Sequence, residues 1–211
     1  VSTLSDQSIC ANGTYPLLDA GNPGATFQWN DQNGPIAGAT SQTYQTTQAG
    51  TYSVTVGSGS CAGTGQMILT VNAIPTPALT SASICDYDAI PTLDAGAYAS
   101  ASYQWNDQNG PIAGATAQTY TPTVAGTYSV DVTIPPGCTG SSSMSLTVNA
   151  APTPLVADAD ICTDQQATLD ASVAGASYQW SNGGNTQTIS TNVAGTYTVL
   201  VTLNNCTATD T

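Results

Sequence analysis

Apolar and polar residues alternate along short stretches of this chain, and clusters of Gly, Pro, Ser, Thr and Asn separate the stretches. The clearest alternation occurs in "AGTYSVTV" (residues 49–56), "AGTYSVDV" (125–132) and "AGTYTVLV" (194–201). A period of two residues, with turn signals roughly every 8–12 residues, is typical of strands that bury one face. No stretch shows the apolar period of about 3.6 residues that a helix needs. The pattern therefore predicts an all-β fold of small sandwiches.

The same short sequence motifs occur three times in the same order, aligned on Trp29, Trp105 and Trp180. In each repeat a Cys precedes a Leu-Asp-Ala stretch, an aromatic-Gln-Trp stretch follows, and a second Cys comes after Ala-Gly-Thr-Tyr. The first two repeats end in "LTVN", and Pro-rich segments follow them. We therefore predict three domains in a linear array, at residues 1–74, 75–151 and 152–211. The third domain is expected to lack its final strand within these residues.

One thirteen-residue stretch, "QWNDQNGPIAGAT", occupies residues 28–40 and recurs unchanged at 104–116. Its "NDQNG" part predicts a hairpin turn, and "PIAGAT" predicts the returning strand, with Pro at an edge-like start. The third repeat has "SNGGNTQTI" at this place. Because the third repeat has the other motifs without this stretch, the stretch is interpreted as the same corner of two sandwiches. A ligand site present in two copies is the alternative.

The composition removes most catalytic chemistry. The chain has no Lys, Arg or His, and its 13 acidic residues are all Asp. A Ser or Cys nucleophile therefore has no His or Lys to activate it, and acid–base catalysis could use only Asp. Phosphate groups have no cationic partner, and the net charge of −13 opposes binding to nucleic acid. We expect a protein that is not an enzyme and has no cofactor. No apolar run reaches the about 18 residues that a membrane span requires.

Cysteine is spaced regularly, with two residues in each repeat. The six positions are Cys10, Cys61, Cys85, Cys138, Cys162 and Cys206. An even count without clustered C-x-x-C pairs favours disulfides over a zinc site, and hence an oxidising compartment. Isopeptide bonds are excluded because the chain has no Lys.

A small group of acidic residues lies at the start of the third repeat, at Asp158, Asp160 and Asp164. Calcium prefers carboxylate and carbonyl oxygens, and it binds at joints between many extracellular domains. These three residues are therefore calcium candidates. Solvated carboxylates near a turn are the alternative, since no EF-hand-like loop is present.

The succession of Trp, Asn-Gly, Ile-Ala-Gly-Ala-Thr, Tyr and Gly-Thr-Tyr-x-Val-x-Val resembles bacterial immunoglobulin-like repeats. The third repeat, "ICTDQQATLDASVAGASYQWSNGGNTQTISTNVAGTYTVLVTLNNCTATD", is similar to the tandem Ig/PKD-like repeats of very large Bacteroidota surface proteins, which include type IX-secreted and gliding-motility adhesins. The resemblance implies a core Trp on strand C and a tyrosine corner at the start of strand F. The implied core residues are Trp29, Trp105, Trp180, Tyr52, Tyr128 and Tyr197.

The resemblance leaves two disulfide patterns open, with free thiols as a third alternative. The first Cys of each repeat lies near the A–B turn and the second near the F–G turn, at opposite ends of an immunoglobulin sandwich. Bonded cysteines need Cα atoms within about 7 Å. If strand A runs differently here, bonds form within domains, as Cys10–Cys61, Cys85–Cys138 and Cys162–Cys206. If the turn of one domain meets the hairpin tip of the next, the bonds are Cys10–Cys138 and Cys85–Cys206. Cys61 and Cys162 are then left for neighbouring repeats.

These observations predict an extracellular structural stalk of a large bacterial surface adhesin that serves attachment or gliding. The alternatives are a subunit of a polymeric filament joined by strand exchange or disulfides, and a glycan-binding module of a secreted enzyme. The expected partners are neighbouring repeats of the same chain or filament, with surface glycans or other cells as further candidates. Nucleic acid and direct membrane insertion are not expected.

Overall fold

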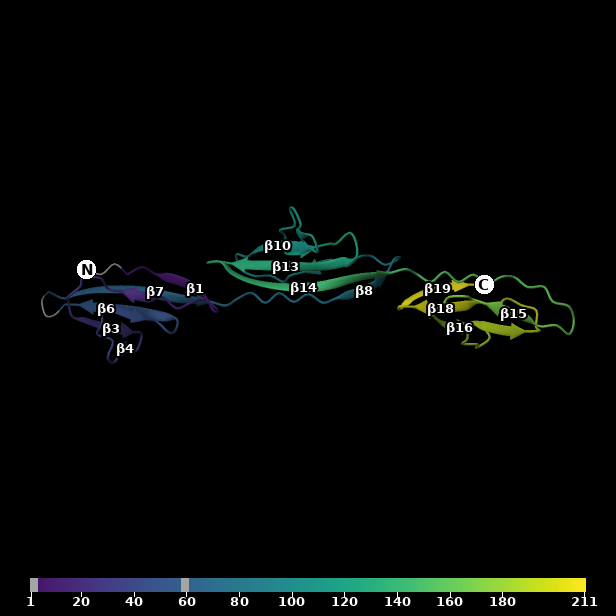
Figure 1. The fold of residues 1–211 in the computed structure, drawn as a ribbon, viewed down its shortest axis with the longest axis horizontal. Helices are drawn as coiled ribbons and strands as arrows, with labels where there is room; N and C mark the ends of the chain where they lie inside the picture. The colour runs from purple at the N-terminus through teal and green to yellow at the C-terminus, as the bar shows by residue number, and fades with distance from the viewer. Residues whose placement is uncertain (1–3, 58–60) are drawn as a thin grey trace.

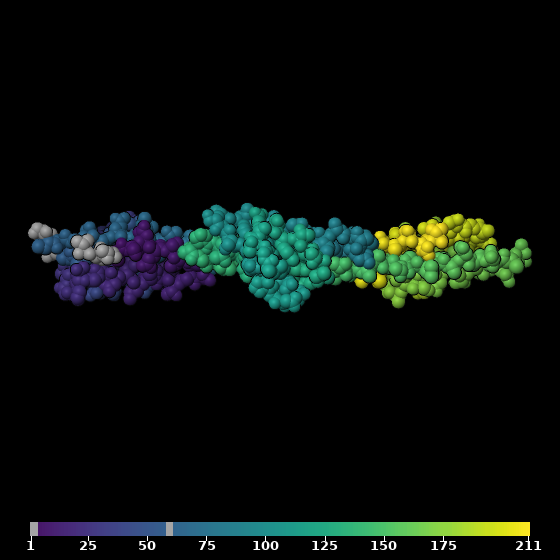
Figure 2. Space-filling view, turned by 90° about the horizontal axis from the view of Figure 1, so that it is seen from above, coloured from purple at the N-terminus to yellow at the C-terminus, as the bar shows by residue number. Residues whose placement is uncertain are grey.

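The chain folds into three β-sandwiches that follow one another along an elongated rod (Figures 1 and 2). The computed structural model describes residues 4–57 and 61–211. Each sandwich has its own hydrophobic cluster, centred on Trp29, Trp105 and Trp180 in turn. The predicted all-β architecture is confirmed, and no helix among the described residues is long and apolar enough to cross a membrane.

The first domain packs a five-stranded sheet against a two-stranded sheet. The larger sheet has the order β1-β7-β6-β3-β4, with β1 (Gln7–Cys10), β7 (Gly63–Asn72), β6 (Gly50–Val56), β3 (Phe27–Asp31) and β4 (Gly34–Pro35). The smaller sheet pairs β2 (Leu17–Asp19) with β5 (Thr43–Gln45). Alternate residues of β6 and β7 are buried, as the period of two predicts.

The second domain repeats this topology. Its larger sheet has the order β11-β10-β13-β14-β8, with β11 (Gly110–Pro111), β10 (Ser102–Asp107), β13 (Gly126–Ile134), β14 (Cys138–Asn149) and β8 (Ala82–Cys85). The smaller sheet pairs β9 (Leu93–Asp94) with β12 (Thr119–Tyr120). In both domains the edge strand runs parallel to the last strand, so that Cys10 stands opposite Asn72 and Cys85 opposite Asn149.

The third domain keeps only part of this arrangement. Its sheets are β16-β18-β19 and β15-β17, with β15 (Ala167–Asp170), β16 (Ser177–Trp180), β17 (Thr188–Thr191), β18 (Val199–Leu203) and β19 (Cys206–Asp210). A groove of about 620 Å³ lies between residues 156–161 and residues 193–197. In the other two domains the second half of the last strand occupies the corresponding place, between the edge strand and the strand that carries the corner Tyr.

The tryptophans form the centre of each core. Trp29 and Trp105 are fully buried, and Trp180 is 2% exposed. Each indole Nε1 donates a hydrogen bond to a backbone oxygen, that of Ser41 at 2.9 Å, Ala117 at 2.9 Å or Thr186 at 2.8 Å. A buried indole therefore keeps its single donor satisfied.

The tyrosines have the same hydroxyl contact in all three domains but differ in burial. Tyr52, Tyr128 and Tyr197 donate to the backbone oxygen four residues upstream, at 2.9, 2.9 and 3.0 Å. Tyr52 and Tyr128 are buried, whereas Tyr197 is half-buried. Met67 and Met144 stand opposite the two buried rings, while β19 ends opposite Val199. Tyr197 therefore has no cross-strand apolar partner among the described residues.

The duplicated thirteen-residue stretch builds a corner in both domains. In the first domain the side-chain Nε2 of Gln28 donates to the backbone oxygens of Trp29 at 2.7 Å and Ile36 at 3.0 Å, and Gln104 makes the same two bonds in the second domain. The predicted returning strand is shorter than expected, since β4 and β11 have two residues each. The chain then turns back, because the Ala39 oxygen accepts from the Trp29 amide. The polar side chains thus serve the hairpin itself.

A carboxylate clamp recurs where the Leu-Asp-Ala strand ends. In the second domain Asp94 Oδ1 accepts from the Gly96 amide and from Gln118 Nε2, both at 2.8 Å. The Gln118 side chain and then the Gly96 amide hold the pKa of Asp94 below its usual value. Asp19 with Gln42 and Asp170 with Gln187 repeat this contact, with the same direction of pKa.

We predict that these clamps contribute stability above about pH 4 that acid removes. Because each folded-state pKa is depressed, the contribution is lost as the pH falls through the folded value. The triple variant Asp19→Asn/Asp94→Asn/Asp170→Asn should melt below the wild type at pH 6, and the gap should narrow as the pH falls through the folded-state pKa values. Calorimetry over this range is the measurement, with the exposed Asp160→Asn as control. A gap that is constant with pH would contradict the prediction.

We also predict that a strand added after Thr211 stabilises the third domain. Appending the residues of 144–149 places a Met opposite Tyr197, by the register of Met144 and Tyr128. Burial of the added Met and Leu should contribute about 3 kcal/mol or more. Hydrogen exchange of β18 amides measures the effect. The matched control carries Asp in place of the added Met and Leu, and equal protection by both extensions would contradict the prediction.

Candidate functional site: the interdomain joints

The two disulfides of the structure both cross from one domain to the next. Cys10 bonds to Cys138 and Cys85 bonds to Cys206, with Cα atoms 5.4 and 5.5 Å apart. In each pair the first cysteine ends the edge strand of one domain, and the second begins the last strand of the following domain. Each joint therefore has two covalent connections, the peptide linker and the disulfide.

The alternative of disulfides within domains is wrong, and the sheet geometry gives the reason. Cys10 stands opposite Asn72, at the end of β7, whereas Cys61 precedes the first residue of that strand. A strand of ten residues spans about 33 Å, far beyond the about 7 Å that a disulfide allows. The same separation applies to Cys85 and Cys138 along β14. The interdomain pairing is confirmed.

The first cysteine of each pair, which ends the edge strand, begins a tight turn. We call this turn and its cysteine the receiving half of the joint. The Gly13 amide donates to the Cys10 oxygen at 2.8 Å, and the Asp88 amide donates to the Cys85 oxygen at 3.0 Å. In the second joint Asp88 Oδ2 also accepts from the Cys85 amide at 2.8 Å. These bonds fix the direction of the cysteine side chain, which faces the hairpin of the next domain.

The second cysteine of each pair, which begins the last strand of the following domain, lies at a hairpin tip. We call this hairpin and its cysteine the donating half of the joint. Asn204 and Asn205 both have positive φ, 49° and 65°, as a two-residue loop between β18 and β19 requires. Cys206 comes directly after them and is fully buried. In the first joint Cys138 is 1% exposed. Both sulfurs are therefore shielded from solvent on the hairpin side.

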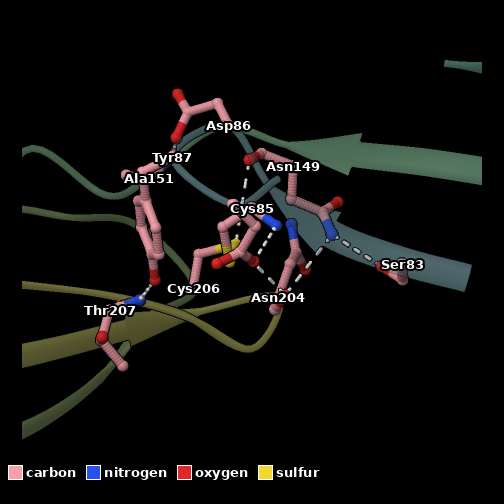
Figure 3. Close-up of a disulfide and its surroundings, with 10 residues drawn as sticks. Ser83, Cys85, Asp86, Tyr87, Asn149, Ala151, Asn204, Cys206 and Thr207 are labelled. Atoms are coloured by element: carbon pink, nitrogen blue, oxygen red, sulfur yellow. Dashed lines mark hydrogen bonds between the residues drawn. A yellow bond between two sulfur atoms is a disulfide. The ribbon is translucent and has the colours of Figure 1, made fainter. Parts of the chain in front are cut away.

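The second joint has polar contacts around its disulfide (Figure 3). The Tyr87 hydroxyl accepts from the Thr207 amide at 3.1 Å, and Asn149 Nδ2 donates to the Asn204 oxygen at 3.5 Å. On the linker side the Ala151 amide donates to Asp86 Oδ1 at 3.2 Å. These bonds hold the hairpin tip against both the receiving turn and the linker.

The first joint depends on a close backbone contact. A Cβ atom at Gly140, two residues after Cys138, would overlap the Pro75 carbonyl of the linker. Only glycine leaves room for this approach. The corresponding residue of the second joint is Ala208, so the two joints are packed differently at this position.

The remaining two cysteines lie outside the joints. Cys61 and Cys162 are free and exposed in the structure. The sequence predicts them to be disulfide-bonded or left for neighbouring repeats, and the structure pairs neither of them. The thiols and disulfides are the chemically reactive groups of the joint region, and their characteristic reaction is thiol–disulfide exchange.

The calcium candidates are not brought together. Asp158 and Asp160 line the groove of the third domain, and Asp164 lies in the turn after Cys162 with φ of 74°. Across residues 4–57 and 61–211, no three acidic or cysteine side chains are close enough to hold a metal ion. The clustering in sequence does not produce a cluster in space because the segment runs extended along the groove.

Comparison with known proteins supports the fold. No protein family model and no curated protein matches the chain. A solved structure of titin domains I67–I69 has a TM-score of 0.53 at 15% identity, over 99% of this chain and 94% of that one. The extracellular domains 3–5 of Drosophila OTK have a TM-score of 0.47 at 12% identity, over 99% and 93%. The titin match supports a fold of tandem immunoglobulin-like β-sandwiches.

Sequence reasoning missed the polar partners of the disulfides. Tyr87 and Asp86 stand beside Cys85 in the sequence, where the word "ICDYD" differs from "ICANG" and "ICTDQ" in the other repeats. That difference was the available signal for a joint-specific contact. The role of Gly140 has no such signal, because only the spatial course of the linker reveals it.

We predict that Gly140→Ala weakens the first disulfide. The added Cβ must displace the Pro75 backbone, which should lower the equilibrium constant of the Cys10–Cys138 bond by about tenfold. Mass spectrometry after equilibration in glutathione buffers measures the bonded fraction. Ala208→Gly is the control in the second joint and should leave the Cys85–Cys206 bond close to wild type. An unchanged Cys10–Cys138 constant would contradict the role of Gly140.

Proposed function

We propose that this chain is an extracellular structural spacer, a stalk segment of a large bacterial surface adhesin. The observation that carries the proposal is that both disulfides cross the joints. A disulfide inside a domain would stabilise that domain alone. A disulfide between domains instead restrains bending and twisting of the joint, which is the property that a spacer needs.

The length of the closed loops supports a mechanical role. The bonded cysteines are 128 and 121 residues apart in the sequence, so each closed loop contains most of two domains and the linker between them. Interfaces between neighbouring domains of one chain commonly allow relative motion. Here the linker and the disulfide attach each pair of domains at two points, and the contacts of Tyr87 and Asn149 add to the second joint.

The chemistry of the surface agrees with an extracellular place. Disulfides persist in oxidising compartments. A charge of −13 without any cationic side chain makes parallel rods repel one another, which keeps them separate. The absence of Lys and Arg also removes every site for proteases of trypsin specificity. The assignment to bacterial adhesins used in attachment or gliding comes from the resemblance of the repeats.

A filament subunit is the second candidate, and the exposed thiols favour it. Cys61 and Cys162 are free and exposed in a chain whose other cysteines are bonded. In this function the chain itself is the repeating unit, and covalent bonds between chains replace peptide linkers. Both functions require stiff joints within the chain.

We predict that opening the two disulfides makes the rod flexible without unfolding its domains. Cys61 and Cys162 are first alkylated, and small-angle X-ray scattering is then measured before and after reduction. Reduction should shorten the mean end-to-end distance and broaden the distance distribution, because the linkers alone then connect the domains. Circular dichroism and tryptophan fluorescence serve as controls for the folded domains. Identical scattering before and after reduction would overturn the spacer proposal.

A further inference from the structure

The third domain presents the receiving half of a joint. The Gln165 amide donates to the Cys162 oxygen at 3.1 Å, and Gln165 Oε1 accepts from the Cys162 amide at 3.3 Å. Asp88 makes the same two contacts with Cys85, where the disulfide is formed. The turn that positions a bonded cysteine in the second joint is thus already built around the exposed thiol of Cys162.

The first domain presents the donating half. Cys61 lies two residues before β7 begins at Gly63, and Cys138 likewise lies two residues before Gly140. Cys61 is exposed, whereas Cys138 and Cys206 are buried by their joints to 1% and 0% exposure. The hairpin cysteine is therefore buried where it is bonded to a neighbouring domain and exposed where it is not.

Residues 156–161, which lead to Cys162, line the groove together with residues 193–197. In the other two domains this place is filled by the last strand, which ends opposite Cys10 or Cys85 and passes into the next domain.

The two free thiols cannot meet within one chain. Cys61 lies at the end of the first domain that faces away from the second, since Cys10 marks the joint and β7 separates the two. Cys162 likewise lies away from the second domain, which contacts the third through Cys206 at the opposite end of that domain's sheet. Figure 1 shows the first and third domains at opposite ends of the rod.

We infer that Cys162 of one copy of this chain forms a disulfide with Cys61 of a second copy, so that the rods join head to tail. This inference rests on the second candidate function, the filament subunit, and extends it by naming the two cysteines that join its copies. The contact uses two different surfaces, so it does not close a symmetric dimer and instead repeats into a linear fibre. The new joint reproduces the pairing seen twice within the chain, a receiving turn with a hairpin cysteine.

The bond requires a disulfide oxidant such as glutathione disulfide. The Cys162 thiolate attacks one sulfur of the oxidant and releases a glutathione thiolate, which takes up a proton. The Cys61 thiolate then attacks the Cys162 sulfur of the mixed disulfide and releases the second glutathione. Two protein thiols lose two electrons and two protons, and glutathione disulfide is reduced to two molecules of glutathione.

Charge repulsion opposes the encounter of two copies. Each chain carries −13, and neither has a cationic side chain to offset the other's charge. Added salt screens this repulsion over a distance of about 10 Å at 0.1 M. Joining between chains should therefore become faster as the salt concentration rises, unlike an association driven by opposite charges.

The test uses two single variants of the full chain, Cys61→Ser and Cys162→Ser, incubated with glutathione disulfide alone and together. Each variant keeps one of the two thiols. We expect the mixture to form a species of twice the 21.2 kDa chain mass that reduction reverses, while each variant alone stays monomeric. The wild type should form a ladder. Pepsin digestion and mass spectrometry then identify the Cys61–Cys162 linkage and verify that Cys10–Cys138 and Cys85–Cys206 are intact.

Three outcomes would overturn the inference. Dimers of a single variant alone would show that like cysteines pair without the turn-and-hairpin geometry. A mixture that stays monomeric or forms only glutathione adducts, with both thiols accessible to alkylation, would show that the two halves do not fit. A rate that falls with added salt would contradict the like-charged encounter. None of these results affects the scattering test, since the thiols are blocked there and the internal joints are measured alone.

Discussion

The structure depends on the opposite placement of the two cysteines in each domain. The edge strand runs parallel to the last strand, so a cysteine at the end of the first is a full strand length from a cysteine at the start of the second. A bond inside the domain is geometrically impossible, and a bond to the next domain is within reach. Because the edge strand pairs in parallel with the last strand, the disulfides form between successive domains and link them into a rod.

This arrangement separates the stability of each domain from the stiffness of the array. Within the core, the places where antibody-type domains carry their disulfide hold Leu18 and Val54 in the first domain, both buried. Domain stability therefore comes from apolar packing around Trp29 and from its satisfied indole. At the joints the chain has no cationic side chain and can form no Lys or Arg salt bridge. Disulfides and hydrogen bonds are the directional interactions left to fix one domain on the next.

Much of the fold was predictable from the sequence, and the differences have physical causes. The alternating words located β6 and β13 to within one or two residues, whereas β18 begins at Val199, later than the predicted start at residue 194. Residues 195–198 have no partner strand there, so the motif "AGTYTVLV" forms a shorter strand than the related motifs in the other two domains. The candidate cysteines were also found from sequence. Their pairing could not be predicted uniquely, because it depends on which strand the edge strand joins, and a repeated pattern does not encode that choice.

The third domain shows that sheet completion and joint formation are parts of one process. In the first two domains the strand that covers Tyr52 or Tyr128 ends beside the receiving cysteine and leads into the linker. The strand that completes one core therefore also leads into the linker that places the next domain beside the cysteine to which it is bonded. In the third domain the described strand β19 ends opposite Val199, and Tyr197 is less buried than Tyr52 and Tyr128. Each core and each joint thus depend on the same strand, which makes the array directional.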